Sequence, residues 1–329
     1  MTISIKNAII HIMDIANGVP VLSNDQLLVD EDVTAFISDI IEKTFQSDDI
    51  KECTFREGAS VWTQCKNAEW DLNSISQSIA TNIYTIMRRN SEIPSADIVF
   101  GTAQINSTDY FFMLKLDYKS AFTHHIDTNN GNKDRRIDII RYKTLLPTQT
   151  TKVGEGFFIN MQNPCVKVVE RKFTVDGIKD YYLSPQILAC CENKTPRQKA
   201  TKVLQVAEKV SGLYYAREDK VDTHISATML DELQREQPLL VENLGRKFFP
   251  DNPVAQQEFF ERLAASDISK DETLSLSEKF QKKFEKQAIR TTSGVEIKIP
   301  TQVYTNADEV EFINNPDGTV SLLIKNIKL

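Results

Sequence analysis

Two aspartates and a lysine stand at a spacing that could support metal-dependent hydrolysis of a phosphodiester. Asp97 opens one predicted strand, and Asp117 and Lys119 lie late in the next. Two carboxylates can hold a divalent cation, and a lysine can stabilise the attacking water. In an antiparallel pair that turns near Ser107, positions 97 and 117 would be near neighbours. The pattern is degenerate, and a strand that ends in solvent produces it too. A metal-dependent nuclease is therefore kept as an alternative, and we expect no catalytic residue and no metal.

Three clusters of lysine and arginine could instead contact phosphates without any chemistry. The first crowds a predicted helix start after Thr195, where the helix dipole disfavours cations. The second, which includes Arg141 and Lys143, follows the segment NNGNKD, and the third lines a helix predicted from Leu274 to Ile289. Phosphate contacts of this kind are independent of sequence and sensitive to salt, although any one cluster is more typical of a solvated surface. The candidate DNA-binding residues are Lys194, Arg197, Lys199, Lys202, Arg135, Arg136, Lys279, Lys282, Lys283 and Lys286.

The charge balance of the N-terminal segment points to a different kind of partner. The 329 residues carry a net charge of −7 at pH 7. Residues 1–60 contain 4 Lys or Arg and 11 Asp or Glu, so this segment alone has a net charge of −7. An acidic surface attracts a basic partner and speeds their encounter. A protein-binding adaptor is thus a second alternative, and its candidate acids are Asp30, Glu31, Asp32, Asp48 and Asp49.

Motifs for common cofactors and metals are missing from the sequence. It has no GxxxxGK[ST] or GxGxxG segment, so we expect no cofactor. His124 and His125 are adjacent but have no cysteine or carboxylate cluster at ligand spacing. The five cysteines lack CxxC spacing, which favours reduced and mostly buried thiols. Because no signal peptide and no apolar run near the roughly 20 residues of a membrane span is present, we expect a cytoplasmic protein.

A strand from Tyr110 to Lys119 is predicted to lie near the centre of a sheet. Its large apolar residues alternate between two faces, and one face turns polar at Lys115, which indicates a solvated end. Short connections such as Asn106–Thr108 favour antiparallel neighbours. The other predicted strands of this region are Ile3–Ile15, Val19–Leu22, Asp97–Gln104, Asp138–Leu146, Gly156–Asn160, Val166–Thr174 and Asp180–Leu183.

The period of the apolar residues changes to helical after about residue 190. Helices are predicted around Val33–Phe45 and Leu72–Arg89, and then in a C-terminal series that starts at Thr195. That series continues over Ser226–Arg235, Pro238–Phe248, Pro253–Ala264 and Leu274–Ile289. The turn Asn315–Gly318 predicts a terminal β-hairpin. We therefore expect an α+β protein with a strand-rich domain over 1–190 and a helical domain over 191–329, closed by a β-hairpin.

Several sequence blocks in series resemble the bacterial 37-kDa nucleoid-associated protein family. They are IKNAIIHIMDI, FFMLKLDYKSAFTH, RIDIIRYKTLLP and VEFINNPDGTVSLLIKNI, in matching order along almost the whole chain. The resemblance implies a cytoplasmic protein of the bacterial nucleoid. For some members it also implies binding to double-stranded DNA or to a type II topoisomerase. It offers no catalytic residues, so a non-catalytic role in chromosome organisation, through DNA, a nucleoid enzyme or both, is the function that we expect.

Overall fold

The structure is a computed structural model with two compact units, Met1–Asn193 and Lys194–Leu329. Each unit has hydrophobic core residues of its own. The structure describes residues 1–67, 70–127, 136–148, 151–190, 193–215, 221–234, 239–277, 280, 282, 285–290, 293–304, 306, 308–316 and 319–326.

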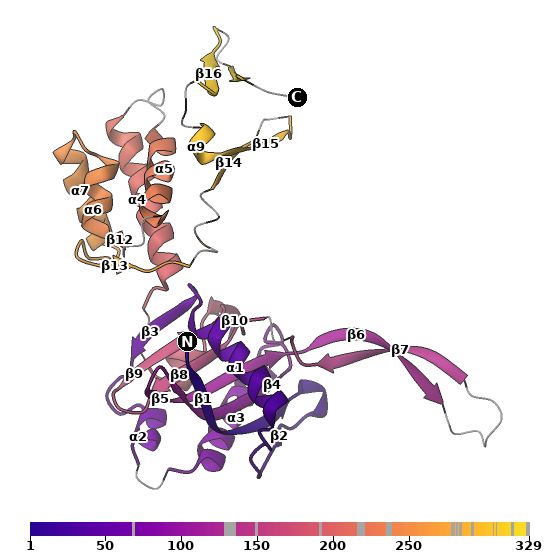
Figure 1. Cartoon of the computed structure of the whole chain (residues 1–329). Coiled ribbons are helices and arrows are strands. Elements are labelled where there is room, and N and C mark those ends of the chain that lie inside the picture. Colours follow the sequence, from indigo (N-terminus) through magenta and orange to yellow (C-terminus); the bar gives the residue numbers. More distant parts are fainter. Residues whose placement is uncertain are drawn as a thin grey trace. The chain divides into compact units, whose positions relative to one another are not determined.

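A seven-stranded antiparallel sheet forms the body of the first unit (Figure 1), with the strand order β2-β1-β4-β5-β8-β9-β3. The predicted central strand is β5, and it lies in the middle of this order. Asn106 and Ser107 both adopt positive φ in the tight turn between β4 and β5, which matches the twist of a two-residue hairpin. The strands are β1 Ile3–Met13, β2 Val21–Leu22, β3 Ile50–Thr54, β4 Ala96–Ile105, β5 Thr108–Asp117, β8 Gly156–Asn160 and β9 Cys165–Val169.

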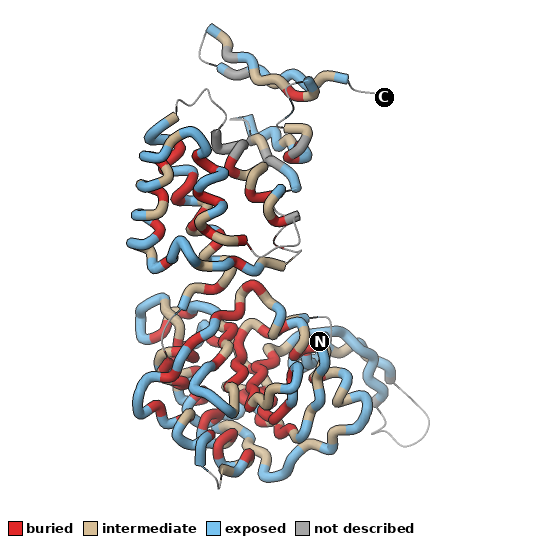
Figure 2. Tube along the Cα trace, turned by 60° about the vertical axis from the view of Figure 1, so that its left-hand side comes forward, coloured by how far each residue is buried: buried red, intermediate tan, exposed pale blue. Residues whose placement is uncertain are grey.

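Helices cover both faces of this sheet. The helix α1 (Glu31–Phe45) packs its isoleucines against the face of β5 that carries Phe112 and Leu114. The helix α3 (Leu72–Arg89) packs against the opposite face, which carries Phe111 and Met113. Both helices were predicted from their apolar spacing, and Figure 2 shows buried residues concentrated in the interior of this unit.

A two-stranded ribbon, β6 (Lys119–Asp127) paired with β7 (Arg136–Leu145), stands out from the body of the first unit (Figure 1). It begins directly after β5, so the expected single strand to Lys119 ends at Asp117 instead. The predicted strand Val166–Thr174 is also split, because β9 ends at Val169 and β10 begins at Phe173. The remaining elements are η1 Ile15–Asn17, α2 Ser60–Cys65, β10 Phe173–Val175, β11 Ile178–Asp180 and the helical turn η2 Leu183–Ile187.

The second unit is built on packed helices. Its first helix begins as predicted, because Thr195 and Gln198 form a reciprocal capping box and Pro196 takes the first helical position. Phe248, Phe249 and Phe259 meet edge to face in its core. The helices are α4 Pro196–Tyr214, α5 Val221–Gln234, α6 Val241–Phe248, α7 Pro253–Ala264 and the short α9 Thr301–Tyr304, and a small pair joins β12 Leu239–Leu240 to β13 Thr273–Leu274.

The helix predicted over Leu274–Ile289 is wrong at both of its ends. Leu274 belongs to β13, and Lys286–Arg290 form β14, which pairs antiparallel with β15 (Glu296–Pro300). Gly294 has a φ of 89° between the two strands, a conformation that suits a turn and that few other residues adopt. The apolar spacing of this segment resembled a helix, but pairing with the alternating strand β15 decided its structure.

The terminal β-hairpin is confirmed. The strands β16 (Val310–Asn314) and β17 (Val320–Ile324) pair antiparallel, with Asn314 opposite Val320. The side chain of Asn315 donates to the hydroxyls of Thr319 and Ser321, both at 2.9 Å, across the start of the turn. Asp317 and Gly318, on which the turn was predicted, lie outside the described residues.

His11 joins the edge of the sheet to α3 inside the first unit. Its Nδ1 accepts a hydrogen bond from the backbone N–H of Ser23 at 3.1 Å, and its Nε2 lies 2.9 Å from the hydroxyl of Ser76. Because Nδ1 is an acceptor, the proton of the neutral ring is assigned to Nε2, which donates to Ser76. The residue is fully buried, and burial lowers the pKa of His11 from 6.5 to about 4.

We predict that His11 makes the first unit less stable in mild acid. The unfolded chain binds a proton on this ring near pH 6.5, whereas the folded chain binds it only near pH 4. The stabilisation is therefore complete above pH 6.5 and is lost as the pH falls toward 4. In urea unfolding, His11→Gln should reduce the slope of the unfolding free energy against pH in this window. The reduction should correspond to about one fewer proton taken up on unfolding. His125→Gln, an exposed histidine, is the control, and an unchanged slope in His11→Gln would contradict the prediction.

Candidate nucleic-acid interface

The register between β4 and β5 separates the two aspartates of the hydrolytic hypothesis. Asp97 lies opposite Leu116, and Asp117 lies opposite Ala96. Directly opposed residues share a face of the sheet and successive residues alternate, so Asp97 and Asp117 project from opposite faces. Lys119 belongs to β6, outside the seven-stranded sheet. The three residues therefore do not converge on one cation, and the nuclease arrangement that we considered is wrong.

Asp97 instead holds the end of the central strand. The hydroxyl of Tyr118 donates to its Oδ1 at 2.6 Å. Burial raises the pKa of Asp97, and the hydrogen bond from Tyr118 opposes this shift. Burial and the neighbouring carboxylate both raise the pKa of Tyr118, so the hydroxyl remains a donor at neutral pH. This bond ties the first residue after β5 back to β4.

Asp117 belongs to a partly buried charge network with Lys115, Glu155 and Arg171. The Nζ of Lys115 lies 2.8 Å from Glu155 and 2.7 Å from Asp117, and the side chains of Lys115 and Glu155 are completely buried. Arg171 bridges Glu155, at 3.1 Å, and Asp117. Burial works against the charge of Arg171, but the two carboxylates outweigh it and raise its pKa. The polar end that we expected to be solvated is thus closed by paired charges.

The cations at the start of α4 are mostly engaged within the second unit. Lys194 lies 3.4 Å from Asp267, and Lys199 pairs with Glu272. Both acids lie after α7. Arg197 also has an interaction partner, whereas Lys202 pairs with no acid among the described residues. Acids of the protein itself therefore compensate for the unfavourable helix dipole, without a need for bound phosphate.

The described lysines of the third cluster form fewer ion pairs than those of the first. Lys286 begins β14, and both it and Lys282 are exposed. Within the described ranges, neither forms an ion pair with Asp or Glu. Lys279 and Lys283 lie outside those ranges. The cluster is not a helix face, because Lys286 lies on a strand.

The ribbon carries the described part of the second cluster. Arg141 donates to the hydroxyl of Ser120 at 2.9 Å, and its guanidinium lies 5.7 Å from the ring centre of Phe122. Lys119 and Lys143 are exposed and have no acidic partner in the part of the chain that the structure describes. Arg135 lies outside that part, and Arg136 opens β7. These cations project from a thin element that a large partner can approach.

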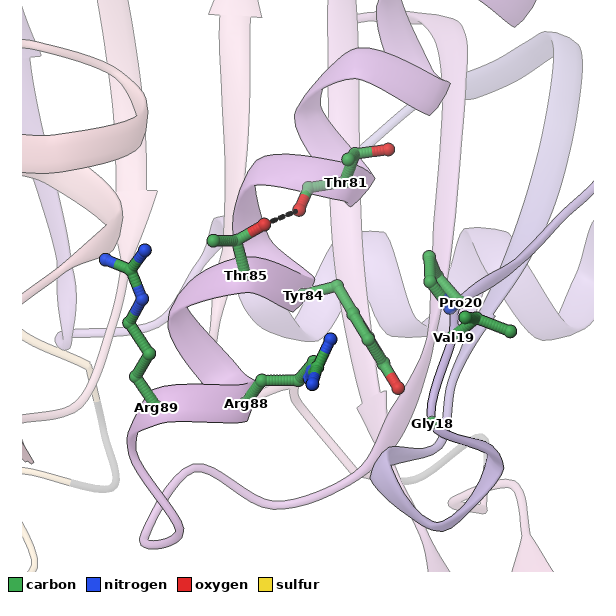
Figure 3. Close-up of a pocket in the computed structure, with 8 residues that line it drawn as sticks. All are labelled: Gly18, Val19, Pro20, Thr81, Tyr84, Thr85, Arg88 and Arg89. Atoms are coloured by element: carbon green, nitrogen blue, oxygen red, sulfur yellow. Dashed lines mark hydrogen bonds between the residues drawn. The ribbon is translucent and has the colours of Figure 1, made fainter.

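Sequence reasoning missed two arginines at the C-terminal end of α3. Arg88 and Arg89 line an open pocket of about 390 Å³, together with Tyr84, two threonines and the turn Gly18–Pro20. Figure 3 shows Arg88 beside the Tyr84 ring and Arg89 on the other side of the helix. Neither arginine pairs with an acid among the described residues. The segment MRRN did contain the signal, but two basic residues at a helix end are also what the helix dipole favours.

Comparison with known proteins places the chain in a family. Residues 9–329 match the family described as nucleoid-associated protein YejK. The chain belongs to this family. No curated protein matches it. The resemblance seen in the sequence blocks is thus confirmed over nearly the whole chain.

The described surface of this family member is marked by exposed cations. Within the described residues, no group of three or more His, Cys, Asp or Glu is placed to hold a metal ion. No helix in those same ranges is long and apolar enough to cross a membrane. The described surface carries exposed lysines and arginines on the ribbon, on β14 and at the end of α3. Such side chains can bind phosphate oxygens.

We predict that Lys115 and Glu155 form a structural pair whose members depend on each other. Lys115→Met leaves Glu155 buried with fewer partners and should reduce the unfolding free energy by about 3–5 kcal/mol. The double variant Lys115→Met/Glu155→Leu should cost less than the sum of the two single changes. Lys6→Met breaks an exposed pair with Asp109 and should cost at most about 1 kcal/mol. Denaturant unfolding measures all four, and additive effects of the buried pair would contradict the prediction.

Proposed function

We propose that this nucleoid-associated protein binds double-stranded DNA without strong sequence preference and without catalysis, as part of chromosome organisation in the bacterial cytoplasm. The observation that carries the proposal is the presence of exposed cations that no described acid neutralises, in a chain whose net charge is −7. Lys119 and Lys143 on the ribbon and Lys282 and Lys286 near β14 are such residues. Retaining free cations against an acidic background is favourable where phosphates approach them.

The chemistry of these residues explains why affinity would exceed specificity. A lysine ammonium is a flexible point charge that follows phosphate positions, and phosphate contacts carry no base identity. Each phosphate that is neutralised releases counterions, so binding weakens as salt rises. Contacts spread over the ribbon and the β14 region would lie in different units of the chain. Both groups would add to the affinity in the same sequence-independent way.

Paired charge removals test this proposal. Fluorescence anisotropy with short duplexes should show that Lys119→Gln/Lys143→Gln and Lys282→Gln/Lys286→Gln weaken binding equally on unrelated sequences. Each lost phosphate contact should reduce the slope of log K against log salt by about 0.9. The matched control is Lys194→Gln/Lys199→Gln, which removes two lysines already paired with Asp267 and Glu272. The proposal fails if the wild type binds no duplex at low salt, or if the control loses as much affinity as the test variants.

A second candidate function, contact with a nucleoid protein, draws on the surface around the start of α1. Three of the five candidate acids serve the fold: Asp30 caps α1, Asp48 is buried and Asp49 pairs with Lys152. Glu31 and Asp32 remain exposed, and Leu28 beside them is 92% exposed. An apolar side chain next to free acids suits a basic protein surface. The first partner to try is a type II topoisomerase.

We predict that this surface governs how fast such a partner associates. Glu31→Gln/Asp32→Asn should lower the association rate several-fold and reduce its salt dependence, whereas Leu28→Ser should mainly raise the dissociation rate. Glu57→Gln, an exposed acid elsewhere in the first unit, is the control. Biolayer interferometry with immobilised topoisomerase measures both rates. Wild-type rates in all three test positions would remove this candidate while leaving DNA binding unaffected.

A further inference from the structure

The β6–β7 ribbon has one strongly apolar face. Residues that lie opposite each other in an antiparallel pair project to the same side. The register places Phe122 opposite Arg141, His124 opposite Ile139 and Ile126 opposite Ile137. All six side chains therefore share one face. The opposite face is more polar, with Thr123 opposite Ile140 and His125 opposite Asp138.

The apolar side chains of this face are open to solvent. Phe122, Ile126, Ile137 and Ile139 are between 44% and 79% exposed. The tube in Figure 2 is coloured as exposed along much of the ribbon. By the usual areas of such side chains, these four present on the order of 400 Å² of contiguous apolar surface, comparable to the largest patch of a typical monomer, which often serves binding. No described element of the chain covers it.

An isolated ribbon of this kind needs a partner. A two-stranded hairpin is at best marginally stable in water, because it buries little surface of its own. The sheet order shows that β6 and β7 pair only with each other in the described chain. Exposed apolar surface on such an element favours association, and a second layer on the apolar face would supply the missing core.

We propose that the apolar face of the ribbon packs against the same face of a second copy of this chain, so that the protein self-associates through its ribbons. A two-fold axis makes the interface complementary to itself, with isoleucines and Phe122 on both sides. If the two ribbons cross in opposite directions, Arg141 of one copy lies away from Arg141 of the other. Two faces of this size, with the flanking His124 and Arg141 side chains, bury on the order of 1,000 Å² in total, near the lower bound for a specific interface.

The composition of the face favours a second copy over DNA as its occupant. A duplex offers phosphate charge and polar base edges, which would leave three isoleucines without apolar partners. Lys119 and Lys143, which pair with no acid among the described residues, lie toward the base of the ribbon. They remain available to phosphates there after self-association. The inference thus goes beyond DNA binding and does not depend on it.

Sedimentation equilibrium of the full chain, without DNA, tests the inference. The wild type should show twice the monomer mass of 37.4 kDa at micromolar concentration. Ile137→Thr/Ile139→Thr keeps β-branched side chains on the strand but removes much of the apolar area, and it should weaken self-association at least tenfold. Ile178→Thr is the matched control, because Ile178 is 71% exposed on β11 and lies off the ribbon. Thermal unfolding checks that each variant stays folded.

Each outcome decides the proposal. A monomeric wild type, or a double variant with wild-type self-association, overturns it. If the wild type is monomeric and the double variant also loses duplex binding, the apolar face is assigned to DNA instead. If the double variant dissociates while Ile178→Thr does not, the interface is assigned to the ribbon.

Discussion

The buried pair of Lys115 and Glu155 is the constraint on which the end of the sheet depends. Lys115 lies near the end of β5, and Glu155 directly precedes β8, so the pair joins two neighbouring strands where both reach the sheet margin. The backbone N–H of Lys115 also donates to the carbonyl of Glu155 at 3.0 Å. A charge buried so completely is tolerated only when its partners are held in place. Asp117 and Arg171 complete the pairing, and the ribbon leaves the sheet from this point.

A second buried pair shows that the same principle operates at another margin of the sheet. Lys51 of β3 lies 2.6 Å from Glu170, which follows β9, and both side chains are almost fully buried. The ring of Tyr181 lies 4.3 Å from the Lys51 ammonium, and Ser184 of η2 donates to Glu170. Some of the charge that the sequence suggests for the surface, such as Lys51 and Lys115, is therefore paired inside the fold. The cations available to phosphates form a smaller set than the composition suggests.

Elements with a strong local period were predictable, and side-chain pairing was not. The apolar spacing of α1 and α3, the capping box at Thr195 and the terminal hairpin all depend on neighbouring residues, and the structure has them as predicted. Asp97 and Asp117 lie on opposite faces because the strands pair one residue away from the register that would place them opposite each other, and only tertiary pairing determines this register. Likewise, the burial of Lys115 depends on Glu155, forty residues later in the chain. Arg88 and Arg89 were missed because their pocket is completed by Gly18–Pro20, from a distant part of the sequence.

The proposed function requires the protein to respond to the phosphate charge of duplex DNA and not to its base sequence. The most direct measurement is the equilibrium affinity for several unrelated duplexes of equal length, each titrated over a series of salt concentrations. We expect straight lines of log K against log salt, with a common negative slope and affinities within about tenfold of one another. Binding that does not depend on salt, or a preference of about a thousandfold for one duplex, would contradict it.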